Sequence, residues 1–149
     1  MKAILSSIGK LMVLGLFTNQ TLAAPSVVEL DSDLFEQLIA DKEQTKVKDG
    51  QTWFIFFDSP QACNPRDLCG DVTEMWQELY KYANVEQTAE ASGYRVARLN
   101  CATSINTCHR LGITGFPTLS VLSGNAIYDY QGALTVESLN DYVVNKEYL

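Results

Sequence analysis

Four cysteines carry the most distinctive chemistry in this sequence, and they form two groups, Cys63 with Cys69 and Cys101 with Cys108. Thiolates attack disulfides, bind metals or become oxidised to structural cross-links. An even number of cysteines in a secreted chain predicts disulfides, and four cysteines allow three connectivities. Zinc binding is the competing interpretation, but neither group has the usual separation of about two to four residues. Because His109 is the only histidine and no nucleotide or flavin motif is present, we expect neither a metal nor another cofactor.

Residues 1–23 have the order of features found in a secretory signal. Two lysines precede the apolar run Leu11–Phe17, and a polar stretch and small residues around Ala23 follow it. The apolar run is too short to span a bilayer. We therefore expect cleavage after Ala23 and a mature chain, residues 24–149, that meets an oxidising compartment and contains no membrane span. An uncleaved amphipathic helix is the alternative.

The composition indicates one folded domain. The chain has 149 residues, of which 46% are hydrophobic and 19% charged, and its mean hydropathy is -0.05. This length suits a single core. The formal net charge is -7, and cleavage after Ala23 would leave 9 basic against 18 acidic residues. This acidic balance makes nucleic acid an unfavourable partner.

Strand patterns recur along the mature chain, with no internal repeat or linker between them. The run Trp53–Phe57 is apolar throughout, which is typical of a strand buried on both faces at the centre of a sheet. A short turn at 123–125 would join the last two strands as a hairpin. The other strand candidates are Val27–Leu30, Tyr94–Leu99, Thr118–Leu122 and Ile127–Tyr130.

Helical patterns alternate with these strands. Apolar residues recur at helical spacing in four segments. Ser32 is a plausible cap for the first helix, and Asp71 suits the first turn of the second. Right-handed crossovers convert this order into a mixed central sheet flanked by helices, an α/β fold. We expect loops at 42–50 and 58–70, and helical apolar faces made by Leu34, Phe35, Leu38 and Ile39, by Val72, Met75, Trp76 and Leu79, by Ile105, Cys108 and Leu111, and by Val136, Leu139, Tyr142 and Val143.

Four parts of the sequence carry a resemblance: WFIFFDSP at Trp53–Pro60, the residue Trp76, RLNCATSINTCHRLGITGFPTLSVL at Arg98–Leu122, and YQGALTVESLNDYV at Tyr130–Val143. Together they resemble a thioredoxin-fold domain of the protein disulfide isomerase family. The resemblance implies a thioredoxin fold and thiol–disulfide exchange with unfolded or cysteine-containing client proteins. It also implies a cis bond between Phe116 and Pro117, beside a groove that holds extended substrate, whereas an ordinary loop-to-strand proline is the alternative.

The same resemblance assigns roles to the cysteines. Cys101 and Cys108 lie where some family members carry a structural disulfide; inert buried thiols, or redox exchange with the other pair, are the alternatives. Cys63 and Cys69 lie at the catalytic positions. In CNPRDLC, however, five residues separate them, where the family has two.

Further departures from the family leave the activity open. Phe56 stands where the family often has a buried glutamate, and Leu134 stands where it has an arginine. Arg66 would favour a thiolate, whereas Asp67 and Asp71 oppose it. In one hypothesis the cysteines at 63 and 69 perform exchange. In the other the domain is a redox-inactive, chaperone-like client-binding module with two structural disulfides, and an adaptor within a larger complex is a third possibility.

The expected location is the endoplasmic reticulum lumen or the exterior of the cell. The segment KEYL, Lys146–Leu149, resembles the frame of a KDEL-type retrieval signal but departs from it at the third position. A frayed helix end is the alternative. We expect His109 to be a solvated helix residue.

Overall fold

Ten elements form the fold in the computed structural model, which describes residues 27–40, 46–62, 68–83 and 93–149. The expected signal at 1–23 lies outside these ranges. The strands are β1 (Val28–Leu30), β2 (Thr52–Asp58), β3 (Arg95–Asn100), β4 (Thr118–Ser123) and β5 (Ala126–Asp129). The helices are α1 (Ser32–Leu38), the 3₁₀ turn η1 (Lys48–Gly50), α2 (Leu68–Lys81), α4 (Ile105–Arg110) and α5 (Val136–Val144).

The five strands make one mixed sheet in the order β1-β3-β2-β4-β5. β2 lies at its centre, parallel to β3 and antiparallel to β4. Because both faces of β2 are covered, its apolar run is continuous: Phe54, Ile55 and Phe57 have no exposed surface. The expected central strand and mixed sheet are confirmed.

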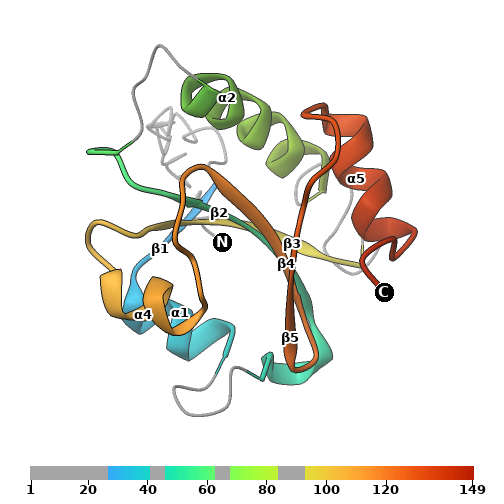
Figure 1. The fold of residues 1–149 in the computed structure, drawn as a ribbon. Coiled ribbons are helices and arrows are strands. Elements are labelled where there is room, and N and C mark those ends of the chain that lie inside the picture. The colour runs from blue at the N-terminus through green and yellow to red at the C-terminus, as the bar shows by residue number, and fades with distance from the viewer. Residues whose placement is uncertain (1–26, 41–45, 63–67, 84–92) are drawn as a thin grey trace, which may run out of the picture.

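Helices cover both faces of this sheet (Figure 1). α2 and α5 lie on one side, whereas α1 and α4 lie on the other. Side chains along β2 alternate between the two cores: Phe54 and Phe56 pack with α2 and α5, and Ile55 and Phe57 pack on the opposite side. Of the helices among the described residues, none has the length and apolarity needed to cross a bilayer.

The expected apolar stripe of α2 is present. Val72, Trp76 and Leu79 are buried against the sheet, and the indole nitrogen of Trp76 donates a hydrogen bond of 2.9 Å to the backbone oxygen of Ala97 in β3. Full burial of one such side chain contributes about 1.5–3 kcal/mol. This packing fixes where the first turn of α2 lies.

The prediction that Ser32 caps the first helix is wrong. Asp31, not Ser32, is the N-cap of α1, and its carboxylate accepts a hydrogen bond of 2.8 Å from the Leu34 amide. Ser32 is the first residue of the helix, and its hydroxyl accepts a hydrogen bond of 2.9 Å from Thr107 in α4. Asp and Ser cap equally well, so their order along the chain does not decide between them.

Two smaller expectations also need correction. Ile105 was expected on the buried face of α4 but is 54% exposed, whereas Thr107 and Cys108 are buried. The buried face is set by the contacts of Thr107 and Cys108 with neighbouring elements, which helical spacing does not contain. The loop expected at 42–50 includes the 3₁₀ turn η1, which ends at Gly50 with a φ of 64°.

The hairpin expected between the last two strands is confirmed. Ser123 pairs with Ala126, so two residues make the turn. Gly124 has a φ of 60°, a left-handed conformation that glycine adopts without steric cost. Its backbone oxygen also accepts a hydrogen bond of 2.8 Å from the Val47 amide, which ties the turn to the segment before β2.

Candidate functional site

Cys69 lies in the first turn of α2, 8% exposed and disulfide-bonded. The other expected catalytic residue, Cys63, lies outside the described residues, together with Arg66 and Asp67. The N-terminal end of a helix favours an anionic sulfur, whereas the carboxylate of Asp71 in the same turn disfavours one. The position of Cys69 is therefore compatible with thiol chemistry. The helix dipole and the Asp71 charge act in opposite directions on a thiolate at this position.

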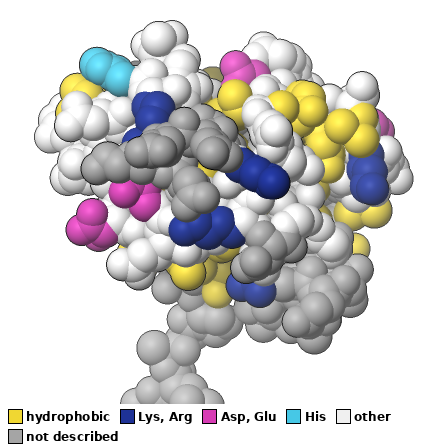
Figure 2. Space-filling model, turned by 90° about the horizontal axis from the view of Figure 1, so that it is seen from below, with side chains coloured by type: hydrophobic (Ala, Val, Ile, Leu, Met, Phe, Trp, Pro, Cys, Tyr) yellow, Lys and Arg dark blue, Asp and Glu magenta, His cyan; other side chains and the backbone are white. Residues whose placement is uncertain are grey.

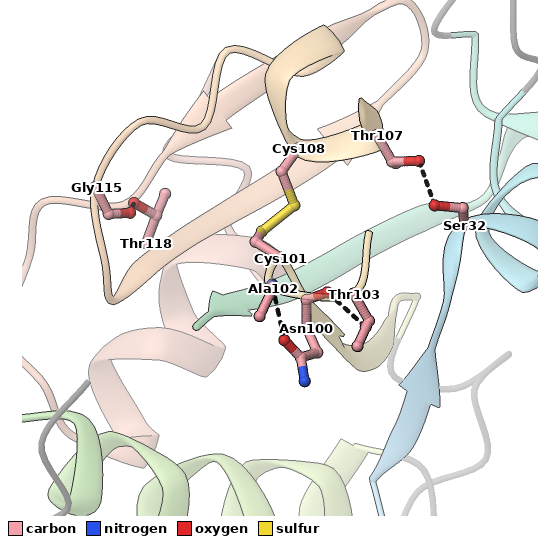
Figure 3. Close-up of a disulfide and its surroundings, with 9 residues drawn as sticks. All are labelled: Ser32, Asn100, Cys101, Ala102, Thr103, Thr107, Cys108, Gly115 and Thr118. Carbon is pink, nitrogen blue, oxygen red and sulfur yellow. Dashed lines mark hydrogen bonds between the residues drawn. A yellow bond between two sulfur atoms is a disulfide. The ribbon is translucent and has the colours of Figure 1, made fainter. Parts of the chain in front are cut away.

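The segment before β4 reaches the same end of the sheet. β4 pairs with β2 so that Thr118 lies opposite Phe57, one residue before Asp58. The Phe116–Pro117 peptide bond is cis. The hydroxyl of Thr118 donates a hydrogen bond of 2.7 Å to the Gly115 backbone oxygen, closing a turn around this bond (Figure 3).

Pro117 lines a groove of about 250 Å³ with residues of α2 and of the segment after β5. Leu68 and Leu134 also line it, and they are 51% and 40% exposed. Exposed apolar side chains beside a concave surface can accept an apolar side chain of an extended peptide. Leu134, where the family has an arginine, therefore makes this groove more apolar.

Phe116 lines a different cavity. This second cavity has a volume of about 320 Å³ and includes Ser59, Gln61 and the Cys101–Cys108 disulfide. The two residues expected to form one substrate groove thus face two separate hollows. The sequence does not show that Phe116 and Pro117 line separate cavities, because this separation depends on how α4 packs beside the segment before β4.

The second pair of cysteines is disulfide-bonded (Figure 3). Cys101 and Cys108 have Cα atoms 5.8 Å apart and are 3% and 1% exposed, and the bond joins the end of β3 to α4. The side chain of Asn100 accepts a hydrogen bond of 2.9 Å from the Ala102 amide at the start of this loop. On a chain-entropy argument such a short closed loop stabilises the fold by about 2–3 kcal/mol. This geometry suits a structural role.

A part-buried ion pair lines the same cavity as Cys69. Asp58, at the end of β2, is 3% exposed, and the Arg98 guanidinium of β3 donates a hydrogen bond to its Oδ2. A second carboxylate, that of Glu29, lies 3.4 Å from Arg98. Burial opposes the charged form of Arg98, but the hydrogen bond and charge of Asp58, with the charge of Glu29, outweigh it and raise the pKa of Arg98. Burial also raises the pKa of Glu29, against the opposing effect of Arg98.

Sequence reasoning missed this pair, although one signal was present. An aspartate directly after the apolar run of β2 predicts a carboxylate at the edge of the core. Phe56, two residues earlier on the same face of the strand, is apolar: its ring centroid lies 5.9 Å from that of Trp76, and Arg98 lies 5.5 Å above it. The strand thus has an aromatic side chain at position 56, and its carboxylate, that of Asp58, lies two residues further along.

His109 is exposed on α4, as expected, and it lines the cavity that contains Phe116 and the Cys101–Cys108 disulfide. Figure 2 shows a histidine at the surface of the face that carries α1 and α4, where basic and acidic side chains are both present. Within the described ranges, no group of three or more His, Cys, Asp or Glu side chains is placed to hold a metal ion.

Two curated proteins are similar to this chain in sequence, whereas no family model matches it. Protein disulfide-isomerase TMX3 of Xenopus laevis is 23% identical over 138 residues, covering 93% of this chain and 28% of the relative. Protein disulfide-isomerase TMX3 of Homo sapiens is 20% identical over 119 residues, covering 78% and 24%. The chain therefore spans about a quarter of the length of these relatives.

Solved structures share the fold. The J-Trx1 fragment of ERdj5 has a TM-score of 0.63 at 22% identity, covering 82% of this chain and 50% of that one. The Trx4 domain of ERdj5 has a TM-score of 0.61 at 14% identity, covering 83% and 97%. Zinc-bound human ERp44 has a TM-score of 0.60 at 17% identity, covering 84% and 31%. Fold and sequence similarity point the same way: the chain has a thioredoxin fold, and the curated proteins that it resembles in sequence are protein disulfide-isomerases.

Proposed function

We propose that this domain performs thiol–disulfide exchange on cysteine-containing client proteins, with Cys63 and Cys69 as its redox pair. The observation that carries the proposal is the disulfide-bonded Cys69 in the first turn of α2, next to Leu68, which lines the groove with Pro117. The helix N-terminus favours a thiolate at Cys69, against the opposing charge of Asp71, and the adjacent groove offers apolar surface to a client peptide.

The exchange has two steps. A client thiolate attacks the Cys63 sulfur, the bond between Cys63 and Cys69 breaks, and Cys69 leaves as a thiolate. A second client thiolate then attacks the client sulfur of the mixed disulfide, and Cys63 leaves as a thiolate. The client gains a disulfide and the domain takes up two electrons; the reverse sequence reduces a client disulfide.

Client binding without redox chemistry is the second candidate function. Two features favour it: Phe56 replaces an ionisable residue of the family, and Leu134 replaces a charged one at the groove. In that case the disulfide of Cys69 is structural, and the exposed Leu68 and Leu134 hold apolar side chains of clients.

We further propose that residues 1–23 are removed as a signal, that residues 24–149 act as one domain, and that the domain works in the endoplasmic reticulum lumen. Retrieval through Lys146–Leu149 remains a prediction. Leu149 is 82% exposed, which favours access by a receptor. The ring of Tyr148, however, packs against Tyr128 and Tyr142 at centroid distances of 5.1 and 5.9 Å, so recognition of the whole segment requires these contacts to open.

The reduction potential of the Cys63 and Cys69 pair decides between the two functions. The mature protein is equilibrated in glutathione buffers, its thiols are trapped, and peptide masses locate them. A potential near about -180 mV supports exchange, whereas a value below about -300 mV identifies a structural disulfide and leaves client binding. The buried Cys101–Cys108 disulfide, followed in the same digests, is the internal reference for a structural bond.

A further inference from the structure

A cavity of about 500 Å³ adjoins α5, and it is larger than the groove that contains Pro117 or the cavity that contains Phe116. Its lining residues come from three segments: the end of β5 with the residues that follow, up to position 133, then α5 itself, and then the segment after α5. We call this hollow the α5 cavity. None of the functions considered above uses it.

The α5 cavity adjoins the groove that contains Pro117, because residues 129–132 line both. Tyr130 is held at this boundary: its hydroxyl donates a hydrogen bond of 2.6 Å to the Ala133 backbone oxygen. A methyl group at Gly132 would meet that hydroxyl oxygen at 2.5 Å, so the ring lies close to the backbone there. A client chain with an apolar side chain in the groove therefore has the α5 cavity within reach of a neighbouring side chain.

Two tyrosine rings line the α5 cavity. The ring centroids of Tyr130 and Tyr142 lie 4.9 Å apart, and both side chains are part-buried. Tyr148, which does not line the cavity, packs against Tyr142 at a centroid distance of 5.9 Å. The face of an aromatic ring attracts a cation, and it also offers apolar surface to the methylene groups of lysine or arginine. The rings are therefore suited to a long basic side chain.

The charge of the α5 cavity favours the same kind of ligand. Its lining includes the exposed carboxylates of Asp129, Asp141 and Glu147, and no lysine or arginine among the described residues. These three carboxylates form no ion pair within the described part of the chain. Burial raises the pKa of Tyr142, and the charge of Asp129 raises it further. Burial, and after it the charge of Glu147, raise the pKa of Tyr130 in the same way.

We propose that the α5 cavity binds an arginine or lysine side chain of a client polypeptide whose neighbouring apolar side chain lies in the groove with Pro117. The proposal rests on client binding, which both candidate functions share, and it adds a preference among clients. The cationic group is attracted by the carboxylates of Asp141 and Glu147, and the methylene groups pack on the tyrosine rings. Because a single exposed ion pair contributes little, the preference requires the rings and the carboxylates together.

The test compares cysteine-free peptides that differ in one side chain. Each labelled peptide contains a leucine and, at a spacing that increases through the series, either an arginine or a glutamine. Fluorescence anisotropy with the mature protein gives the dissociation constants. At the best spacing, the arginine peptide should bind about fivefold or more tightly than its glutamine counterpart, and this difference should shrink at high salt. Equal affinities at every spacing overturn the proposal.

Two double variants show whether the preference arises in the α5 cavity. Asp141→Asn with Glu147→Gln neutralises two of its carboxylates and should bring the arginine and glutamine peptides within about twofold of each other. Glu78→Gln with Glu137→Gln removes the same charge at exposed positions that do not line the cavity, and it should keep the preference. This control separates local recognition from the general attraction of an acidic protein for basic peptides.

The ring resonances of Tyr142 report on the same cavity in the unmodified protein, so this measurement does not depend on how the variants fold. Saturation with the arginine peptide should shift these resonances more than saturation with the glutamine peptide does. Identical shifts from the two peptides would place the arginine elsewhere and overturn the proposal.

Failure of this proposal is distinguishable from failure of client binding. Measurable but equal affinities, or a preference that persists when Asp141 and Glu147 are neutralised, remove the assignment of the α5 cavity and leave client binding intact. If no peptide of either kind binds, client binding itself is removed, and this proposal with it. The reduction potential of the cysteine pair bears on exchange alone.

Discussion

Trp76 and Ala97 tie the helix that carries Cys69 to the sheet: the indole nitrogen donates a buried hydrogen bond of 2.9 Å to the Ala97 backbone oxygen. Trp53 provides a natural comparison, since it is also buried but its indole nitrogen has no hydrogen-bond partner among the described residues. The two tryptophans therefore differ in whether their polar atom is satisfied.

Trp76→Phe should lower the free energy of unfolding by about 1–3 kcal/mol more than Trp53→Phe does. The first substitution removes a buried hydrogen bond to the Ala97 backbone oxygen, whereas the second removes an N–H group that is already unpaired. Urea unfolding of both variants measures the difference. Equal losses would show that the Trp76 hydrogen bond contributes no net stability.

The double substitution Cys101→Ala and Cys108→Ala should lower the free energy of unfolding by about 2–4 kcal/mol, because the open chain gains conformational freedom when it unfolds. Exchange activity measured in folded protein should remain, since these cysteines are assigned a structural role. Loss of exchange with intact folding would instead assign them to the redox chemistry.

Leu68→Ser and Leu134→Ser should each weaken binding of an unfolded client peptide by about tenfold, because each removes apolar surface from the groove with Pro117. Val144→Ser is the matched control: Val144 is 49% exposed on α5 and does not line this groove. Fluorescence anisotropy of a labelled peptide gives the three dissociation constants. An effect of Val144→Ser equal to that of the leucines would contradict a localised groove.

Stability should fall at alkaline pH, in part because of Tyr94. Burial, with a smaller contribution from nearby Tyr82, raises the pKa of Tyr94 well above its usual value. Its hydroxyl donates a hydrogen bond of 3.0 Å to Asn140. A pKa raised in the folded state gives stability that is complete below the unfolded value of about 10 and is lost progressively above it.

The measurement for Tyr94 is the urea midpoint between about pH 8 and pH 11, in the unmodified protein and in Tyr94→Phe. The variant should be less stable at the lower pH because it lacks the hydrogen bond to Asn140, yet it should lose less stability as the pH rises. Parallel curves would remove Tyr94 from the alkaline transition.

Sequence periodicity predicted the elements where one physical factor dominates. The run Trp53–Phe57 identified the central strand because only burial on both faces permits such continuity, and Val72, Trp76 and Leu79 identified the buried side of α2. Helix caps were harder, because Asp31 and Ser32 are adjacent and have similar capping strength.

The residues of the candidate site are brought together by the pairing register of the strands more than by any local sequence pattern. Arg98 reaches Asp58 because β2 and β3 pair so that Phe56 lies opposite Arg98. No local pattern contains that register. Likewise, the separate cavities of Phe116 and Pro117 follow from the packing of α4, which periodicity does not specify.

The short edge strands of the sheet have a consequence for the proposed binding of unfolded clients. Its two edge strands, β1 and β5, have three and four residues and are its shortest. A long open edge would offer unpaired amides and carbonyls to any extended polypeptide, and it would template aggregation. Edges this short provide little backbone for such pairing. In the proposed function, clients would therefore be recognised through side chains and released again, without being added to the sheet as a further strand.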